Sequence, residues 1–407
     1  MNLNKSVLDN FLRYVVVDSQ SDPHFSGEKV PTTECQWDLL KMLEKELKDL
    51  GLKKVLLHEK GYLIATLEGN TDLPPVSFMA HVDTASDVKG NGVKPQVIEN
   101  YDGQDITLKN GLQIKSEDDK YLKSYAGETL IVTDGTTLLG GDDKAGIAEI
   151  MTAVEYLVKN PEVKHPDVEI IFTTDEETGS GMDNFPYEAI RSRACYTLDG
   201  GPRYAVNTEC FNAATVKVKF HGVSIHLGTA RGKMVNAVTL GAKYIDFLNQ
   251  AESPEATDGR YGFYCCLEFT GNGVEAEATI YLRDFDIKNI DRRYDVLKRL
   301  GDSLQAMYPG SRIEVDGKVI YKNMAESAKK NPKAVDLMYK AGQNLKMPLY
   351  EELIRGGTDG ADLAEKGIVC PNIFVGAHNL HSLKEWAALP AMVDATKLIL
   401  EIIKIWE

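Results

Sequence analysis

The stretch VEIIFTTDEETGSG, residues 168–181, decides the fold, because an apolar run ends abruptly in acidic residues. Its first half has the length and composition of a strand that is buried on both faces of a sheet. Three acids follow at once, Asp175, Glu176 and Glu177, and then a glycine-rich loop. Like charges side by side at a strand end repel one another. Either this segment is a solvated turn, or a positive charge lies there in the folded protein.

The segments around this stretch alternate between strand and helix patterns. PPVSFMAHVDT (74–84) is a second short apolar run, and GDDKAGIAEIMTAVEYLVKN (141–160) has apolar residues at helical spacing. Another helix is expected to start where Thr33 and Gln36 form a capping-box pattern and to stop at Gly51. This alternation predicts an α/β domain with a central sheet flanked by helices.

The pattern changes between residues 208 and 321. Strand patterns of period two, such as ATVKVKFHG and VEAEATIYLRDFD, are interspersed with helix patterns, so one face of this sheet is expected to be solvated. The α/β pattern returns after this segment and continues to a C-terminal helix. We therefore predict a large domain of residues 1–207 and 322–407, into which a small α+β sandwich, residues 208–321, is inserted.

Length and charge set further limits. A chain of 407 residues is too long for one compact core. Its net charge of −15 argues against nucleic acid as a partner, because phosphate binding needs clustered cations. No apolar run approaches the ~20 residues that span a bilayer, and the N-terminus lacks the apolar core of a signal peptide. The six cysteines show no CxxC spacing and are expected to be reduced, which indicates a cytoplasmic protein.

Carboxylate and imidazole groups recur where the predicted strands end. They are His81, Asp83, Asp142, Asp143, Glu176, Glu177, Asp199 and His381. In open α/β sheets, ligands bind beyond the carboxyl ends of the strands, so one sheet edge should collect these groups. Three ligating carboxylates and a hydroxide carry four negative charges, which two divalent cations would neutralise. Such a pair of metals generates a nucleophile from water at neutral pH.

Each of these groups also has an ordinary structural explanation. His81 and Asp83 could be a polar strand end, and Asp142 and Asp143 could cap a helix. The acidic triplet could be solvated. The metal site is favoured only because separate segments would otherwise have to end in such residues by coincidence.

Five motifs resemble those of peptidase T, the tripeptide aminopeptidases of the di-zinc aminopeptidase, carboxypeptidase and aminoacylase superfamily. The motifs are HVDT (81–84), LLGGDDKAGIAEI (138–150), TTDEETGSG (173–181), YTLDGG (196–201) and IRGGTDGA (354–361). The resemblance covers essentially the whole chain. It implies a di-zinc exopeptidase catalytic domain with a central mixed sheet, and an inserted ferredoxin-like domain that acts as a lid and in dimerisation.

Carried over position by position, the resemblance also implies a ligand set. One zinc ion would be held by His81 and Asp199, the other by Glu177 and His381, and Asp142 would bridge the two. His381 is preferred over His378 because the family histidine lies four residues before a glutamate, here Glu385. Cobalt or manganese would suit the same residue types.

The resemblance assigns roles to several neighbouring residues. Asp83 would orient His81, Glu176 would be the general base, and the peptide bond between Asp142 and Asp143 would be cis. Of the substrate-binding residues, His226 would reach the active site of the partner in a homodimer, with Asn236 behind it. The family's usual His-Pro-Gly is here His226-Leu227-Gly228.

Two arginines, Arg283 and Arg355, match the family's anchors for the substrate carboxylate. A guanidinium fork suits a carboxylate. The alternative for either arginine is a surface ion pair.

The implied activity is removal of the N-terminal residue from tripeptides, by attack of a hydroxide held between two zinc ions on the first peptide bond. Two alternatives stay open. The same centre could serve a dipeptidase or an N-acyl-amino-acid amidohydrolase, or it could be the remnant of a peptide-binding protein without activity.

Overall fold

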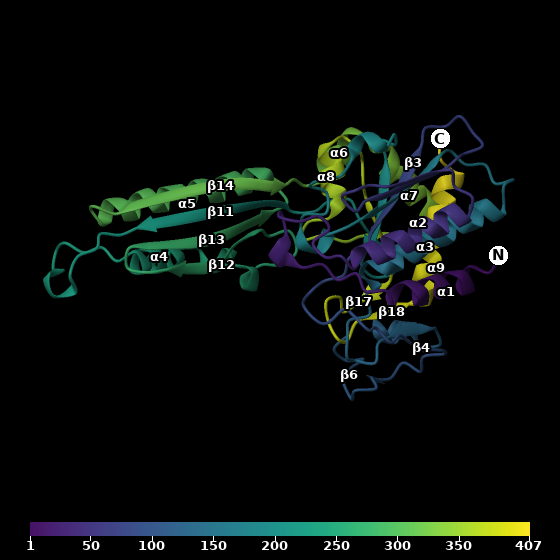
Figure 1. The fold of residues 1–407 in the computed structure, drawn as a ribbon, viewed down its shortest axis with the longest axis horizontal. Helices are drawn as coiled ribbons and strands as arrows, with labels where there is room; N and C mark the ends of the chain where they lie inside the picture. Colours follow the sequence, from purple (N-terminus) through teal and green to yellow (C-terminus); the bar gives the residue numbers. More distant parts are fainter. The chain divides into compact units, whose positions relative to one another are not determined.

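The computed structural model describes residues 1–407 and divides them into two compact units, which Figure 1 traces by colour along the chain. The larger unit comprises Met1–Thr208, Glu326–Glu352 and Thr358–Glu407. The smaller comprises Glu209–Ala325 and Leu353–Gly357. The segment that carries Arg355 therefore packs with the smaller unit, whereas the sequence pattern predicts that it belongs to the larger one.

The larger unit is built on a mixed sheet of eight strands in the order β1-β2-β8-β3-β9-β16-β10-β15. Their bounds are β1 Lys54–Leu57, β2 Leu63–Leu67, β3 Val76–His81, β8 Val168–Thr173, β9 Cys195–Gly200, β10 Ala205–Asn207, β15 Tyr350–Glu351 and β16 Asn372–Phe374. β8, β3, β9 and β16 are mutually parallel, whereas β2 and β10 pair antiparallel on either side of them. The predicted central sheet flanked by helices is confirmed.

The two faces of this sheet are covered unequally. Five helices share one core with one face: α1 Leu3–Val15, α2 Gln36–Asp49, α3 Gly141–Lys159, α7 Lys333–Asn344 and α9 Leu389–Lys404. The other face packs on α8 (Asp359–Glu365) and on apolar residues between 182 and 190. Along β3, Phe78 and Ala80 face the first core and Met79 faces the second, as the period of two requires.

Smaller elements complete this unit. They are β4 Gln96–Ile98, β5 Ile106–Thr107, β6 Gln113–Ile114, β7 Leu130–Val132, β17 Ala377–His378, β18 Trp386–Ala388 and α6 Ala325–Lys330, the last beginning at the border of the smaller unit. β17, β18, β7 and β4 form a second sheet in that order, and β5 pairs with β6. None of the helices in the chain has the length and apolar content needed to cross a membrane.

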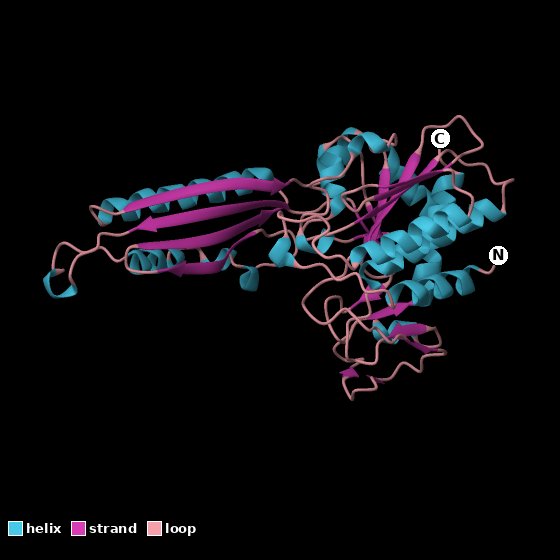
Figure 2. Cartoon of the chain, viewed as in Figure 1, coloured by secondary structure: helices cyan, strands magenta, loops and turns pink.

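The smaller unit is a sheet with two helices packed along it (Figure 2). Its elements are β11 Asn212–His221, α4 Ala237–Asp246, β12 Phe263–Gly271, β13 Glu275–Asp284, α5 Ile287–Met307 and β14 Arg312–Tyr321. The sheet order is β12-β13-β11-β14 with antiparallel pairing throughout. This βαββαβ chain order is that of a ferredoxin-like sandwich. Along β11, buried Val216 and Val218 alternate with exposed Lys217 and Lys219, so one face of the sheet is solvated.

A buried arginine joins the start of α5 to the end of β13 and to the turn that follows α4. The Arg293 side chain on α5 is 4% exposed and donates to Asp284 at 2.6 Å and to Glu252 at 2.8 Å. Asp284 is itself 5% exposed. Removing one partner of a buried ion pair leaves an uncompensated charge in a poorly polarisable environment.

We therefore expect Arg293→Leu to destabilise the smaller unit by about 3–5 kcal/mol. Urea unfolding and hydrogen exchange of the β13 and α5 amides would measure this loss. Lys219→Leu is the control, because Lys219 lies 3.7 Å from Glu277 in an exposed pair, which contributes about 0–1 kcal/mol. Equal stability of the two variants would contradict a structural role for Arg293.

Candidate metal centre

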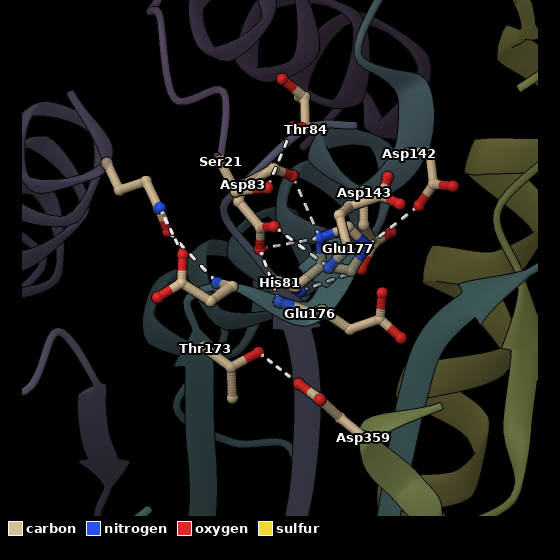
Figure 3. A network of polar contacts seen from close by, with 12 residues as sticks. Ser21, His81, Asp83, Thr84, Asp142, Asp143, Thr173, Glu176, Glu177 and Asp359 are labelled. Atoms are coloured by element: carbon tan, nitrogen blue, oxygen red, sulfur yellow. Dashed lines mark hydrogen bonds and ion pairs between the residues drawn. The ribbon is translucent and has the colours of Figure 1, made fainter. Parts of the chain in front are cut away.

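The centre begins at the carboxyl end of β3. His81 is the last residue of this strand and is 2% exposed. Its Nε2 lies 2.9 Å from Oδ1 of Asp142, and its Nδ1 lies 3.0 Å from the backbone oxygen of Asp83 (Figure 3). The Asp83 carboxylate is further from Nδ1, at 3.4 Å. The nearest group that orients the imidazole is therefore the Asp83 carbonyl.

The Asp83 carboxylate makes its short contacts elsewhere. Its two oxygens accept the backbone N–H groups of Glu176 and Glu177, both at 3.1 Å. Because β3 and β8 are parallel neighbours, with His81 opposite Thr173, these hydrogen bonds join two adjacent strand ends. Asp83 thus fixes the backbone of the acidic triplet.

Asp175, the first acid of the triplet, turns away from the centre. It has a left-handed backbone (φ 61°) and is buried. Its carboxylate accepts the Thr32 N–H at 2.9 Å, the Thr32 hydroxyl at 2.5 Å and the Gln36 amide at 2.7 Å. The expected capping box is therefore wrong: the Thr33 hydroxyl donates to the Gln20 carbonyl instead. Asp175 anchors the loop, which leaves Glu176 and Glu177 for the centre.

A turn before α3 brings in Asp142. Glu385 is 1% exposed and accepts the N–H groups of Leu139 at 2.7 Å, Gly140 at 2.9 Å and Asp142 at 3.2 Å. Gly140 has a left-handed backbone (φ 76°), and the peptide bond from Asp142 to Asp143 is cis, as the resemblance implied. Glu385 therefore shapes the turn through its backbone.

The two aspartates of this turn have different surroundings. Asp142 contacts two imidazoles: Oδ1 lies 2.9 Å from Nε2 of His81, and Oδ2 lies 3.6 Å from Nε2 of His381. Asp143 is fully buried and accepts the N–H groups of His81 and Gly146, both at 3.2 Å. Asp142 is thus the one placed between the two histidines.

The remaining predicted ligands lie around the same point. Glu177 Oε2 is 3.0 Å from Nε2 of His381, and Asp199 Oδ1 is 3.9 Å from Nε2 of His81. The His381 side chain is 41% exposed, so the centre is open to solvent on that side. The structure therefore brings together His81, Asp142, Glu177, Asp199 and His381 from five segments of the larger unit.

Glu176 differs from these residues because its carboxylate forms no hydrogen bond or ion pair, and Figure 3 shows it directed away from Asp83. Burial raises the pKa of Glu176 well above its ordinary value, and the neighbouring Asp199 charge raises it further. A carboxyl group that holds its proton more tightly is a better proton acceptor when it is ionised.

Neighbouring charges and burial also shift the pKa values of the other groups in the centre. Hydrogen bonds to Asp142 and Glu177 raise the pKa of His381 to about 11. Burial alone would raise the pKa of Asp142, but the hydrogen bonds from His381 and His81 outweigh burial and lower it. Burial and the Asp142 charge raise the pKa of Asp199. When protonated, His81 and His381 therefore offset the negative charge of the carboxylates that they contact.

The donor atoms fit a divalent cation. One group consists of His81, Asp142 and Glu177, another of His81, Asp143 and Asp199, and within each the ligand atoms lie within 4.8 Å of one another. Glu177 Oε1 is buried without any hydrogen-bond partner, which a bound cation would satisfy. Asp143 was not a predicted ligand, and its oxygens already accept two backbone N–H groups.

The four predicted substrate-binding residues belong to the smaller unit and form two separate pairs. Arg283 lies opposite Ala213 at the start of β11, and its guanidinium contacts the rings of Tyr281 and Tyr321. Asn236 caps α4 by accepting the Thr239 N–H, near the opposite end of β11. His226 is exposed in the loop that follows β11.

Arg355 is held by its own unit. Its guanidinium donates to the carbonyl oxygens of Thr257, Gly259 and Tyr261 at 2.7–3.2 Å and lies over the Phe211 ring. A substrate carboxylate would have to replace some of these acceptors. Arg283 donates to fewer acceptors, the carbonyl oxygens of Ala214 at 3.4 Å and Leu282 at 2.9 Å, so its guanidinium is the freer of the two.

Sequence patterns missed several residues that organise the centre. The sequence pattern marks Glu385 only by its spacing from His381, although an acid beside the apolar run WAAL also indicates a buried carboxylate. Asp87 lies 3.3 Å from Nδ1 of His381. Asp359 accepts the Thr173 hydroxyl at 2.7 Å and joins α8 to β8, and burial raises its pKa to about 7. No local pattern points to the last two contacts.

A mixed α/β sheet with histidines and carboxylates gathered beyond the ends of its parallel strands defines a hydrolase with a metal centre. The family model for peptidase family M20/M25/M40 matches residues 132–405. The chain is 44% identical to peptidase T of Geobacillus sp. (strain WCH70) and 42% identical to peptidase T of Bacillus subtilis (strain 168), over 100% of its length and 99% of theirs.

The chain therefore belongs to peptidase family M20/M25/M40, and it is a hydrolase. The resemblance to peptidase T is confirmed.

Solved structures share the fold. The aminopeptidase PepT from Bacillus cereus matches with a TM-score of 0.77 and 23% identity, over 98% of both chains. A tripeptidase from Staphylococcus aureus matches with a TM-score of 0.78 and 20% identity, over 99% of this chain and 98% of that one. A dinuclear metal-binding M20 peptidase from Bacillus subtilis is more distant, with a TM-score of 0.63 and 14% identity over 99% and 98%.

The raised pKa of His381 predicts that metal binding releases protons, because an imidazole must lose its proton to ligate a cation. Calorimetric titration of metal-free protein with Zn²⁺ at pH 7, in buffers of different ionisation enthalpy, would count the protons released. In His381→Gln the count should fall by about one.

His24→Gln is the matched control for this titration, because His24 is 89% exposed and lies outside the centre. Its proton count should equal that of the unchanged protein. Zinc binding without net proton release would contradict the arrangement of protonated imidazoles described above.

Proposed function

We propose that the chain is a metallo-aminopeptidase that removes the N-terminal residue of tripeptides. The observation that carries the proposal is the unengaged Glu176 carboxylate beside the cluster of His81, Asp142, Glu177 and His381. A proton acceptor beside a metal centre is what hydrolysis of a peptide bond requires. The peptidase T name of the relatives that match over the full chain supports a short peptide as the substrate.

For the cofactor we propose two Zn²⁺ ions per chain, with Co²⁺ or Mn²⁺ as possible substitutes. His81 and Asp199 would hold one ion, Glu177 and His381 the other, and Asp142 would bridge them. The position of Asp142 between the two imidazoles supports the bridging role. When bound, such ions acidify a water molecule and polarise the peptide carbonyl.

The residues of the chain have distinct roles in this proposal. Glu176 accepts the proton of the attacking water at its carboxylate and returns it to the leaving amine. Asp83 holds the backbone of Glu176 and Glu177 and so sets the direction of both side chains. His226 donates a hydrogen bond to the developing oxyanion.

We further propose that the protein is a homodimer. Arg283 lies at the start of the ten-residue strand β11, and Asn236 and His226 lie beyond its other end. Ten strand residues span roughly 30 Å, whereas an extended tripeptide spans roughly 11 Å. One tripeptide cannot touch both pairs in a single chain, which supports a contribution of His226 and Asn236 from a partner copy, while Arg283 anchors the substrate carboxylate.

A cytoplasmic location is also proposed. The structure holds no disulfide bond, and Cys195 and Cys370 are buried as thiols. Unpaired thiols are typical of a reducing compartment.

Substrate length and Glu176 test the activity together. We expect the zinc-loaded protein to release the N-terminal residue from tripeptides faster than from dipeptides or tetrapeptides, and to leave N-acyl amino acids intact. Glu176→Gln should lower kcat by roughly 10²- to 10⁴-fold while the metal content stays unchanged. Glu177→Ala should lose metal as well, because a ligand is removed. Chromatography of the products and elemental analysis provide the two readouts.

The control for these variants is Glu162→Gln, the same change on an exposed loop of the larger unit. Near-normal turnover of Glu176→Gln would show that another group is the base. Preferred cleavage of dipeptides or N-acyl amino acids would assign the same centre to one of those related activities.

Mixing two inactive variants tests the dimer. If His226 acts in the partner's site, a hybrid of a Glu176→Gln subunit with a His226→Ala subunit contains one intact site. Random reassortment then restores about a quarter of the unchanged activity, because half of the dimers are hybrids with one of two sites intact. Activity that remains at the level of the separate variants, although hybrids form, would contradict exchange of His226.

A further inference from the structure

One acidic side chain beside the metal centre has no partner. The Glu352 carboxylate is half-buried and forms no hydrogen bond or ion pair. It lies over Gly201, where a β-carbon built on the glycine would come within 3.2 Å of Oε2 of Glu352. Gly201 follows Asp199 by two residues in the motif YTLDGG, so this carboxylate lies next to the strand end that carries a proposed metal ligand.

The carboxylate lies on the same side of the chain as Asp199. The backbone remains extended past β9, because Gly376 donates to the Gly201 carbonyl at 3.2 Å. Side chains of residues two apart in an extended chain point to the same face and are separated by roughly 6–7 Å. A side chain at position 201 would therefore crowd Glu352 on the face of the chain that Asp199 shares.

Glu352 is held rigidly at this place. Its N–H donates to the Val206 carbonyl at 2.9 Å, and its carbonyl accepts the Asn207 amide at 2.8 Å. Its neighbour Glu351 points the other way, where its carboxylate accepts the Thr208 N–H at 2.7 Å and the Tyr339 hydroxyl at 3.0 Å. Of two adjacent glutamates, one is thus fully used by the fold and the other is free.

The surroundings of Glu352 also suit a cation. Tyr121 and Tyr350 lie nearby, and aromatic faces attract cations. Lys120 is close enough for its charge to interact with that of Glu352, but its Nζ lies over the Tyr121 ring at 4.6 Å and forms no ion pair with the carboxylate.

We propose that Glu352 binds the protonated N-terminal amine of the substrate. This inference rests on the proposed aminopeptidase function. In a substrate whose first peptide bond is cleaved, only one carbon separates the ammonium nitrogen from the carbonyl carbon. The ammonium must therefore lie close to the metal ligands, and the Glu352 carboxylate lies against Gly201, two residues after the proposed ligand Asp199. A free N-terminus becomes a requirement because an acylated one leaves this carboxylate without a partner.

The test compares three isosteric or conservative variants of the zinc-loaded full chain on a tripeptide and on its N-acetylated form. Glu352→Gln should raise KM for the free tripeptide roughly 10- to 100-fold with little change in kcat, since the lost contact is the same in ground and transition states. The rate of hydrolysis of the acetylated peptide should not fall. The ratio of kcat/KM for the free tripeptide to kcat/KM for the acetylated one should therefore decrease. Glu352→Asp should recover part of the KM, and Glu351→Gln should resemble the unchanged protein.

The outcomes separate this inference from the proposed function. If the unchanged protein cleaves tripeptides and Glu352→Gln has the same KM and discrimination, the amine is recognised elsewhere and the inference is wrong. If the unchanged protein cleaves no tripeptide, the inference and the proposed function are both wrong. Lys120→Gln should leave KM unchanged or lower it. If the KM of Lys120→Gln rises as much as that of Glu352→Gln, the two residues act as a structural pair and the inference is wrong.

Discussion

The carboxylate of Asp83 accepts two backbone N–H groups at the end of the neighbouring strand, and the candidate centre depends on this contact. The parallel pairing of β3 with β8 makes it possible, because it places the carboxyl ends of both strands side by side. With its backbone fixed from one side by Asp83 and from the other by Asp175, the 176–177 turn has little freedom. Two adjacent glutamates can then differ in function: one contacts His381, and the other stays unpaired.

The same centre contains several carboxylates but few cationic side chains. Lys144 follows Asp142 and Asp143 closely, yet its Nζ donates to the Val17 carbonyl at 2.7 Å, and burial lowers its pKa to about 8. The positive charge at the carboxylates comes from His81 and His381. Divalent ions in place of those protons would bring positive charge to the same carboxylates and satisfy the orphaned Oε1 of Glu177.

The smaller unit divides its polar groups between the two ends of one sheet. Arg283 and Arg355 lie at one end, and both are neighbours of Phe263. The Phe263 ring contacts Arg355, and Phe263 on β12 pairs with Arg283 on β13. Asn236 and His226 lie beyond the other end of β11. The strand keeps these groups apart, so one short peptide cannot contact both sets on the same unit. The Glu352 carboxylate belongs to the larger unit and does not have this constraint.

The sequence by itself determined the strand ends and the candidate ligands, because apolar runs and motif spacing are local signals. It identified His81, Asp142 and His381 as groups that meet, and their distances agree with that prediction. Only the tertiary structure decided how the remaining polar groups pair. The local pattern predicts that Gln36 caps a helix, but its amide donates to Asp175, 139 residues away. Glu385 accepts N–H groups from a turn more than 240 residues before it. Glu351 and Glu352 look alike in sequence, and only the contacts of their side chains, at and just past the end of β15, distinguish them. Hydrogen bonds between distant segments depend on how the strands and helices pack, and no periodicity in the chain encodes that packing.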